Sequence, residues 1–220
     1  MEVVVDESLQ SIMRVGVVVI DNMQPPGDGG EAIWQMFNAL SNTLRDLYSG
    51  KNVSEVPGVQ GARTLYRAVG LDPTKTRPSS EALLRRSIKG KGVYRIHPLV
   101  DLLNFISMKT MIPIGLYDTS KIAGNTVRIQ IGDNEWGFDG IRKARVNVTG
   151  RLCVADDIGP FGSPTSDSLR TSIEGDVPAA LVLLYQAISD SATHLSEAIA
   201  LVKSLISLYM RGNVSDMKIV

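Results

Sequence analysis

The order of helical and extended patterns along this chain of 220 residues predicts an α+β fold. Helical periodicity dominates residues 31–111, short β-branched runs dominate residues 113–155, and helical periodicity returns after residue 178. Because the two kinds of pattern are grouped and do not alternate, they argue against a doubly wound parallel sheet. The hydrophobic content of 44% and the charged content of 21% are those of an ordinary globular protein.

The first two elements are predicted to be a buried strand and an amphipathic helix. The run "RVGVVVI" (14–20) is continuously apolar and rich in β-branched residues, which is typical of a strand covered on both faces. Prolines and glycines predict a loop over residues 22–30. From residue 31 to residue 47, apolar side chains recur at spacings of three and four and therefore share one face of a helix. These side chains are Ile33, Phe37, Leu40, Leu44 and Leu47.

Two short helices are predicted to follow. The first covers about 59–70 and is ended by a glycine. The two prolines of segment 71–78 then disfavour helical backbone. Ser79 or Ser80 is a good N-cap for the second helix, which we expect to end at Gly90.

The remaining elements are a buried helix, a group of strands and a helical end. Leucine, isoleucine and methionine recur through residues 97–111 and predict the helix. Short runs broken by Gly, Asn and Asp predict strands within 113–155, followed by an irregular loop over 159–168. Residues 178–210 are predicted to form two helices with a break near 189–191. We therefore divide the chain into a main domain, 1–175, and a C-terminal helical extension, 176–220, packed on the same domain.

The composition argues against several classes of site. Cys153 is the only cysteine, so an intrachain disulfide and a cysteine-based metal cluster are both impossible. His97 and His194 lie far apart in the sequence, and we predict no metal site and no cofactor. The first residues do not resemble a signal peptide, and no early apolar run reaches the ~20 residues of a membrane span. We expect a cytoplasmic protein with no membrane partner.

Positive charge is concentrated in one part of a chain whose formal net charge is zero. Residues 61–95 contain nine basic and two acidic residues, a local net charge of +7. A basic face of this kind is typical of proteins that bind phosphate-rich ligands. Arginine also anchors loops through internal ion pairs, and both interpretations stay open. The candidate nucleic-acid-binding residues are Arg77, Arg85, Arg86, Lys89 and Lys91.

Five short segments between residues 60 and 175 carry a family resemblance. They are "YRAVGLDPTKTRP" (66–78), "PLVDLLN" (98–104), "PIGLYDTSKIAG" (113–124), "VADDIGPFG" (154–162) and "DSLRTSI" (167–173). In this order they resemble the editing (B-three/B-four) domain of the phenylalanyl-tRNA synthetase beta subunit and its freestanding relatives. The resemblance implies a layered α+β domain with an unusual β-sandwich core flanked by helices. It also implies a pocket for the 3′ end of a mischarged tRNA, whose tyrosyl ester is hydrolysed there.

One departure from the synthetase pattern affects the expected chemistry. A histidine of the editing pocket follows Pro-Leu in that pattern, and the matching residue here is Gly115. Glycine has no side chain with which to move a proton or form a hydrogen bond. The histidine-dependent part of the editing machinery is therefore not carried over.

Polar residues in the matching segments are the candidate site residues. Asp156 and Asp157 follow a predicted strand and are the catalytic candidates, because two carboxylates can bind an ammonium group or orient water. Alternatively, one caps the turn and the other pairs with a basic residue such as Arg170. The substrate-binding candidates are Asn104, Gly115, Tyr117, Asp167, Ser168, Arg170 and Thr171. We expect Asn104, Gly115, Asp156 and Arg170 to line one cavity beside the basic face.

Three functions are compatible with these residues. The first is an editing protein that binds tRNA, or its aminoacylated 3′ end, and acts in trans as an aminoacyl-tRNA deacylase. The second is a non-catalytic module that binds RNA or an amino acid, which Gly115 favours. The third is a hydrolase of small-molecule esters or amides. The sequence leaves open whether the chain is an enzyme, and it predicts no oligomeric state.

Overall fold

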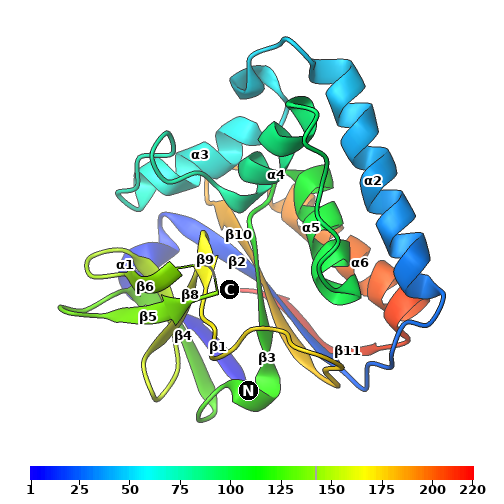
Figure 1. Ribbon diagram of the computed structural model, residues 1–220. Coiled ribbons are helices and arrows are strands. Elements are labelled where there is room, and N and C mark those ends of the chain that lie inside the picture. Colours follow the sequence, from blue (N-terminus) through cyan, green and yellow to red (C-terminus); the bar gives the residue numbers. More distant parts are fainter. Residues whose placement is uncertain (142) are drawn as a thin grey trace.

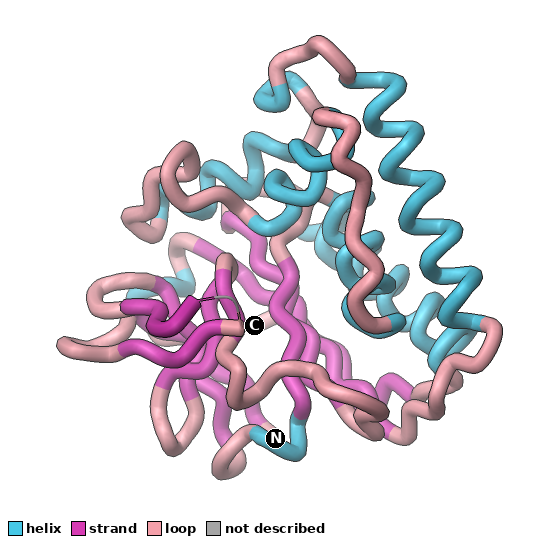
Figure 2. Tube along the Cα trace, viewed as in Figure 1, coloured by secondary structure: helices cyan, strands magenta, loops and turns pink. Residues whose placement is uncertain are grey.

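The computed structural model describes residues 1–141 and 143–220, with the side chains of all of these except residues 143 and 144. It shows helices and strands in separate layers, which confirms the predicted α+β class (Figure 1). Figure 2 shows the strands gathered on one side of the molecule and most helices on the other. Among the described residues, no helix combines the length and the apolar character needed to cross a membrane.

A four-stranded antiparallel sheet forms the middle of the fold. Its order is β11-β2-β10-β3. The strands are β2 (Met13–Asp21), β3 (Ile114–Asp118), β10 (Ala180–Ala187) and β11 (Asn213–Ile219). Strands from both ends of the chain thus meet in one sheet, with β2 and β10 at its centre.

A five-stranded sheet packs against one face of this middle sheet. Its order is β1-β4-β7-β8-β9, in which only the β1–β4 pair is parallel among the described strands. The strands are β1 (Glu2–Val5), β4 (Thr126–Ile131), β7 (Leu152–Ala155), β8 (Pro160–Ser163) and β9 (Ser166–Asp167). A separate hairpin consists of β5 (Gly137–Gly140) and β6 (Lys143–Asn147). The two packed sheets form the expected β-sandwich.

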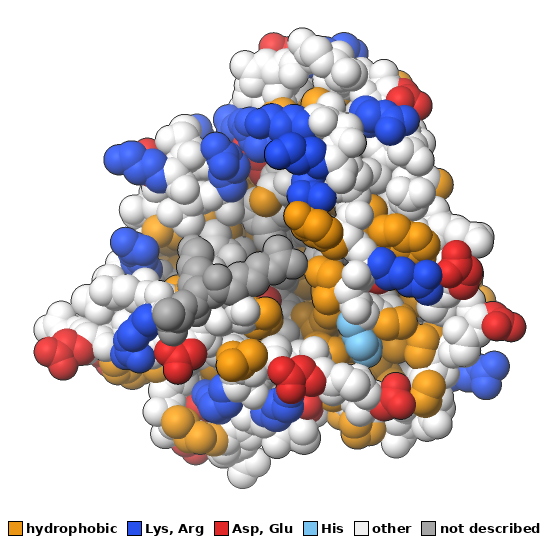
Figure 3. Space-filling model, viewed as in Figure 1, with side chains coloured by type: hydrophobic (Ala, Val, Ile, Leu, Met, Phe, Trp, Pro, Cys, Tyr) orange, Lys and Arg blue, Asp and Glu red, His pale blue; other side chains and the backbone are white. Residues whose placement is uncertain are grey.

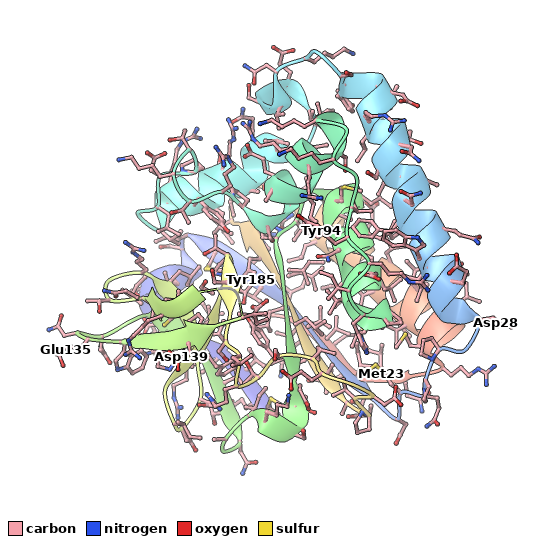
Figure 4. All side chains as sticks on the ribbon, viewed as in Figure 1. Met23, Asp28, Tyr94, Glu135, Asp139 and Tyr185 are labelled. Carbon is pink, nitrogen blue, oxygen red and sulfur yellow. The ribbon has the colours of Figure 1, made fainter. Side chains whose placement is uncertain are left out.

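The apolar run of β2 explains why the middle sheet is covered on both faces. Val15 and Val17 belong to the core between the two sheets, together with Tyr185 of β10. Val18 and Ile20 point the other way and belong to the core under the helices. Successive strand residues point to opposite faces, so a continuously apolar strand has to be buried on both sides. Figure 4 shows Tyr185 in the interior of the molecule.

Helices cover the outer face of the middle sheet. They are α2 (Gly29–Tyr48), α4 (Ser79–Ile88), α5 (Pro98–Thr110) and α6 (Ala192–Leu205), which continues as a π-helical turn (Ile206–Met210). Phe37 of α2, Ile106 of α5 and Val202 of α6 are buried in one apolar core. Shorter helices are α1 (Glu7–Gln10), α3 (Val59–Ala68) and the 3₁₀ turns Val53–Glu55 and Thr119–Lys121. The predicted helices up to residue 111 are confirmed.

The helical prediction for residues 178–188 is wrong, because this segment is strand β10. All eight of its residues, "ALVLLYQA", are buried. A short run that is apolar except for one residue, here Gln186, shows neither the helical nor the strand period, so the pattern does not separate a buried helix from a buried strand. Segment 176–220 therefore contains the central strand β10 and the edge strand β11 as well as α6, and its description as a helical extension is wrong.

Two local predictions also need correction. The segment 159–168 is not an irregular loop, because it contains the short strands β8 and β9. The N-cap of α4 is Pro78, whose ring has no hydrogen-bonding group with which to cap the helix, and neither serine takes that role. Ser80 donates a hydrogen bond from its hydroxyl to the carbonyl of Met111 at 3.1 Å. The buried Ser79 hydroxyl has no partner among the described residues.

Candidate functional site

A cavity of about 550 Å³ opens between the helical and the β part of the molecule. Figure 1 shows α5 and β3 on one side of this region and β5, β6 and β9 on the other. The space-filling view shows a hollow on this face with hydrophobic side chains along its helical side (Figure 3). The main apolar lining residues are Val100, Leu103, Ile114, Leu116, Leu169 and Ile173. The volume lies within the range of ~300–1,000 Å³ that is usual for small-molecule sites.

Asp167 supplies an unusual carboxyl group to the wall of this cavity. Burial raises the pKa of Asp167 to about 7, although the Tyr117 hydroxyl acts in the opposite direction. Its Oδ1 atom is buried and has no hydrogen-bond partner among the residues that the structure describes. A carboxyl that titrates near neutral pH inside a cavity is suited to binding a cation or transferring a proton.

Asn104 lies on α5 and lines the same cavity. No hydrogen bond of its side-chain amide occurs in the described part of the chain. The hydroxyls of two neighbouring lining residues, by contrast, are committed to backbone carbonyls. Ser107 donates to Ile112 at 2.7 Å, and Ser172 donates to Leu169 at 2.9 Å. Asn104 and Asp167 therefore offer polar atoms that a ligand can use.

Two tyrosines support Asp167 from within the sandwich core. The hydroxyls of Tyr117 on β3 and Tyr185 on β10 lie 3.3 Å apart. Burial raises the pKa of Tyr117 well above its usual value, and the nearby Tyr185 and Asp167 raise it further. Both tyrosines therefore stay protonated near neutral pH, and their hydroxyls remain available as hydrogen-bond donors behind the carboxyl group.

Gly115 does not line the cavity, because its strand neighbour Tyr117 occupies the adjacent space. A Cβ atom at position 115 would lie 2.5 Å from the Tyr117 hydroxyl oxygen. The same oxygen would also clash with a Cβ atom at Gly162 on β8. The tyrosine ring thus packs over two glycines, and a side chain as large as histidine has no room at position 115.

Asp156 and Arg170 form a bidentate ion pair away from the cavity wall, in which the carboxylate is buried and the guanidinium is partly exposed. Their oxygen–nitrogen distances are 2.8 and 3.0 Å. The carboxylate also accepts from the backbone N–H groups of Ala123, Ile158 and Gly159. Burial raises the pKa of Asp156, but the hydrogen bonds from Arg170 and the backbone outweigh burial and lower it overall. Every acceptor position of Asp156 is in use, so the pair has the structural role that was the alternative prediction.

The other predicted residues near this pair also have structural partners. Asp157 is exposed and forms an ion pair with Arg128 at 3.2 Å. The hydroxyls of Ser168 and Thr171 lie 3.0 Å apart and hold the loop after β9. Of Asn104, Gly115, Asp156 and Arg170, only Asn104 lines the cavity. The expectation that these four residues share one cavity is therefore wrong.

Several basic residues of segment 61–95 are committed to structural contacts. Arg63 and Arg85 both pair with the buried Glu81 at 2.7 Å. Arg86 donates to the carbonyl of Lys91 at 3.1 Å, and its guanidinium stacks 3.6 Å from the ring centre of Tyr94, which Figure 4 labels. These contacts account for Arg85 and Arg86 without a ligand.

Other basic side chains of this segment are exposed to solvent instead. Arg77, Lys89 and Lys91 are exposed and form no ion pair with any described residue. Figure 3 shows basic side chains gathered over the α3 and α4 side of the hollow. Arg77 precedes the end of α4 at which Ser79 lines the cavity. Lys89 and Lys91 follow the other end, which a helix of this length places ~15 Å away.

The sequence interpretation did not identify the hydroxyl residues of the cavity wall. Ser79, Thr165 and Ser166 line it, and the last two directly precede Asp167 in the β8–β9 turn. A Ser/Thr-rich turn next to a candidate carboxylate was the only available signal in the sequence. The tertiary fold places this turn and the start of α4 in the wall of one cavity.

Comparison with known proteins agrees with this architecture. The family model described as the B3/4 domain matches residues 61–177, which is more than half of the chain. A solved structure, the N-terminal fragment of the phenylalanyl-tRNA synthetase beta subunit from Pyrococcus horikoshii, superposes with a TM-score of 0.51 at 10% sequence identity. The alignment covers 97% of this chain and 50% of that fragment, so the present chain spans about half of its length. A comparison with curated proteins gives no match. On the family match, the chain belongs to the B3/4 domain family.

Proposed function

We propose that this protein hydrolyses the ester bond of an aminoacyl-tRNA, with the aminoacyl group held in the cavity. The observation that carries the proposal is the placement of Asn104 and Asp167 in the wall of a largely apolar cavity of about 550 Å³, both with polar atoms that have no hydrogen-bond partner among the described residues. Both residues lie within the part of the chain that matches the B3/4 domain. The apolar wall suits an amino-acid side chain, and the polar groups suit its ammonium and ester groups.

The chemistry requires few groups, because an aminoacyl ester is already activated. The oxygen of a water molecule attacks the ester carbonyl carbon, and the bond from that carbon to the ribose oxygen breaks. The Asp167 carboxylate takes a proton from the water and passes it to the leaving ribose oxygen, acting first as general base and then as general acid. The Asn104 amide orients the aminoacyl group by hydrogen bonding, so the reaction gains from positioning.

The environment of Asp167 suits this role better than the environments of Asp156 and Asp157, which were first expected to be catalytic. The raised pKa of Asp167, about 7, gives a substantial fraction of each protonation state near neutral pH. Asp156 is held in its charged form by Arg170, and Asp157 is exposed beside Arg128. Neither of them lines the cavity.

A non-catalytic binding module is the second candidate, and the packing of Tyr117 over Gly115 favours it. In that case the site has a cavity for an aminoacyl group but no proton-transferring histidine on β3. Under this alternative, RNA or an amino acid binds and the ester survives. A hydrolase of free small esters differs from both candidates because its activity does not depend on the tRNA part of the substrate.

A deacylation assay tests the proposal. Wild-type protein is incubated with a panel of mischarged tRNAs and with the methyl esters of the same amino acids. The proposal predicts hydrolysis of at least one aminoacyl-tRNA and much slower hydrolysis of its methyl ester. Binding without turnover supports the second candidate, and equal turnover of tRNA and methyl esters supports a small-molecule hydrolase. No turnover of any mischarged tRNA above the buffer rate removes the proposal.

A further inference from the structure

A second, smaller hollow adjoins the main cavity and is basic. Its volume is about 220 Å³, and Lys75, Arg77 and Arg151 supply its cationic side chains. The two hollows share the lining residues Val146, Thr165 and Ser166. They are therefore two compartments of one groove, separated at the turn between β8 and β9. We call the smaller one the cationic compartment.

Most of the positive charge of this compartment has no counter-ion among the residues that the structure describes. No carboxylate is found among its described lining residues. Arg77 and Arg151 are exposed and form no ion pair within the described part of the chain. Lys75 interacts with the exposed Asp72, whose pKa is lowered first by hydrogen bonds from Thr74 and to a smaller extent by the Lys75 charge. A hollow with three cations and no carboxylate among its described lining residues is suited to an anionic ligand.

The loop that carries Lys75 and Arg77 is ordered by its own hydrogen bonds. The Asp72 side chain accepts from the backbone N–H of Thr74 at 2.8 Å and from its hydroxyl at 2.7 Å. The backbone carbonyl of Asp72 accepts from Thr76 at 2.8 Å. Such an Asx turn fixes the loop before any ligand arrives. The cations therefore need little ordering on binding, which favours affinity.

The turn that separates the compartments is also fixed. The Tyr66 hydroxyl on α3 donates to the carbonyl of Pro164 at 2.8 Å, and the Ser163 hydroxyl accepts from the backbone N–H of Ser166 at 3.1 Å. Thr165 and Ser166 are thereby held at the shared edge, and Asp167 follows them directly. A ligand that reaches Asp167 from the cationic compartment passes these residues.

We propose that the cationic compartment binds the phosphate of the nucleotide whose ester-linked aminoacyl group occupies the main cavity. This inference rests on the proposed function and names the part of the substrate that each compartment takes. The shared edge at Thr165 and Ser166 faces the ribose, whose hydroxyls match the polar groups there. Guanidinium groups bind phosphate oxygens through paired hydrogen bonds, which suits Arg77 and Arg151 to the role. The compartment then makes the protein bind RNA-linked substrates in preference to free amino-acid esters.

Binding measurements with matched variants test the inference independently of catalysis. The probes are a short single-stranded RNA ending in CCA, adenosine 5′-monophosphate and adenosine. The variants are R77A/R151A, the conservative R77K/R151K and the control K89A/K91A, which removes the same charge beyond the far end of α4. We expect R77A/R151A to weaken RNA binding at least tenfold and to abolish any preference for the monophosphate over adenosine. We expect less than a threefold loss for the control and an intermediate loss for R77K/R151K.

The outcomes separate this inference from the proposed function. RNA binding that depends on Arg77 and Arg151 without ester hydrolysis upholds the compartment and removes the catalytic proposal. Hydrolysis of aminoacyl-tRNA with an unchanged KM in R77A/R151A overturns the compartment and leaves the catalytic proposal standing. An equal loss of binding in K89A/K91A, or no binding of any probe by the wild type, overturns the compartment. Unchanged thermal unfolding shows that the variants fold. The single variant R151E gives a second test of RNA binding by the cationic compartment.

Discussion

The hydroxyl of Tyr117 lies over Gly115, two residues earlier on the same strand, where a Cβ atom would be 2.5 Å from the hydroxyl oxygen. Side chains two apart on a strand share a face, so the tyrosine ring fills the space that a side chain at position 115 would need. This packing explains why glycine stands where the synthetase pattern has histidine. It also places a protonated hydroxyl behind Asp167.

The first prediction concerns this packing. We expect G115A to lower the free energy of unfolding by about 1–3 kcal/mol, the usual cost of overpacking a core. Urea unfolding monitored by circular dichroism measures the change. In the Y117F background, the loss caused by G115A should be smaller, because the hydroxyl oxygen that the new methyl group meets is gone. Equal losses in both backgrounds would show that the tyrosine hydroxyl is not the obstacle.

The second prediction compares two adjacent aspartates. D156N leaves the partly exposed Arg170 guanidinium without its carboxylate partner, and the loss should stay below the ~3–5 kcal/mol that breaking a fully buried pair costs while exceeding the loss for D157N. D157N removes only an exposed pair with Arg128, which is worth about 0–1 kcal/mol. Unfolding free energies of the two variants provide the test. Similar values for both would contradict the buried, fully paired role of Asp156.

The third prediction concerns Arg85, for which a structural and a nucleic-acid-binding role were both considered. Arg85 and Arg63 compensate the buried Glu81 carboxylate, each at 2.7 Å. We expect R85A to lower the melting temperature clearly and to change RNA affinity less than R77A does. Differential scanning fluorimetry and RNA titration of both variants give the comparison. A stable R85A variant that binds RNA poorly would assign Arg85 to the interface.

The fourth prediction is a pH dependence of stability from Asp167. Its folded-state pKa, about 7, is above the ordinary value of 3.8, so the folded protein binds more protons than the unfolded chain between these pH values. This contribution to the free energy of unfolding therefore falls as the pH rises from about 4 to about 7. D167N should flatten that part of the stability curve. Identical curves for wild type and D167N would contradict the raised pKa.

Local patterns in the sequence were sufficient for much of the fold. The spacing of Ile33 and Phe37 predicts α2, and the β-branched run 14–20 predicts β2 with both faces covered. The same reasoning failed for β10, whose run at 180–187 is apolar except for Gln186 and is buried throughout. The side chains of this run are compatible with both a buried helix and a buried strand. Its pairing with β2 and β3 makes it a strand.

The candidate site was predictable only in part. Asn104 and Asp167 were selected from the family resemblance, and both line the cavity. Asp156 was selected by its place after a strand, but it is the hydrogen bonds from Arg170 and three backbone N–H groups that determine its role. The cationic compartment combines a loop at 72–77 with Arg151, which are far apart in the sequence. Only the packed sheets bring them to the same edge.

The central claim is that Asp167 carries the proton in aminoacyl-tRNA hydrolysis. Single-turnover hydrolysis of a mischarged tRNA by wild type, D167N and the control D157N, measured from pH 5 to pH 9, tests it most directly. The account predicts a wild-type and D157N rate that rises with pH through an apparent pKa of about 7, and a D167N rate at least a hundredfold lower without that rise. A D167N protein that keeps the wild-type rate and pH profile would contradict the claim.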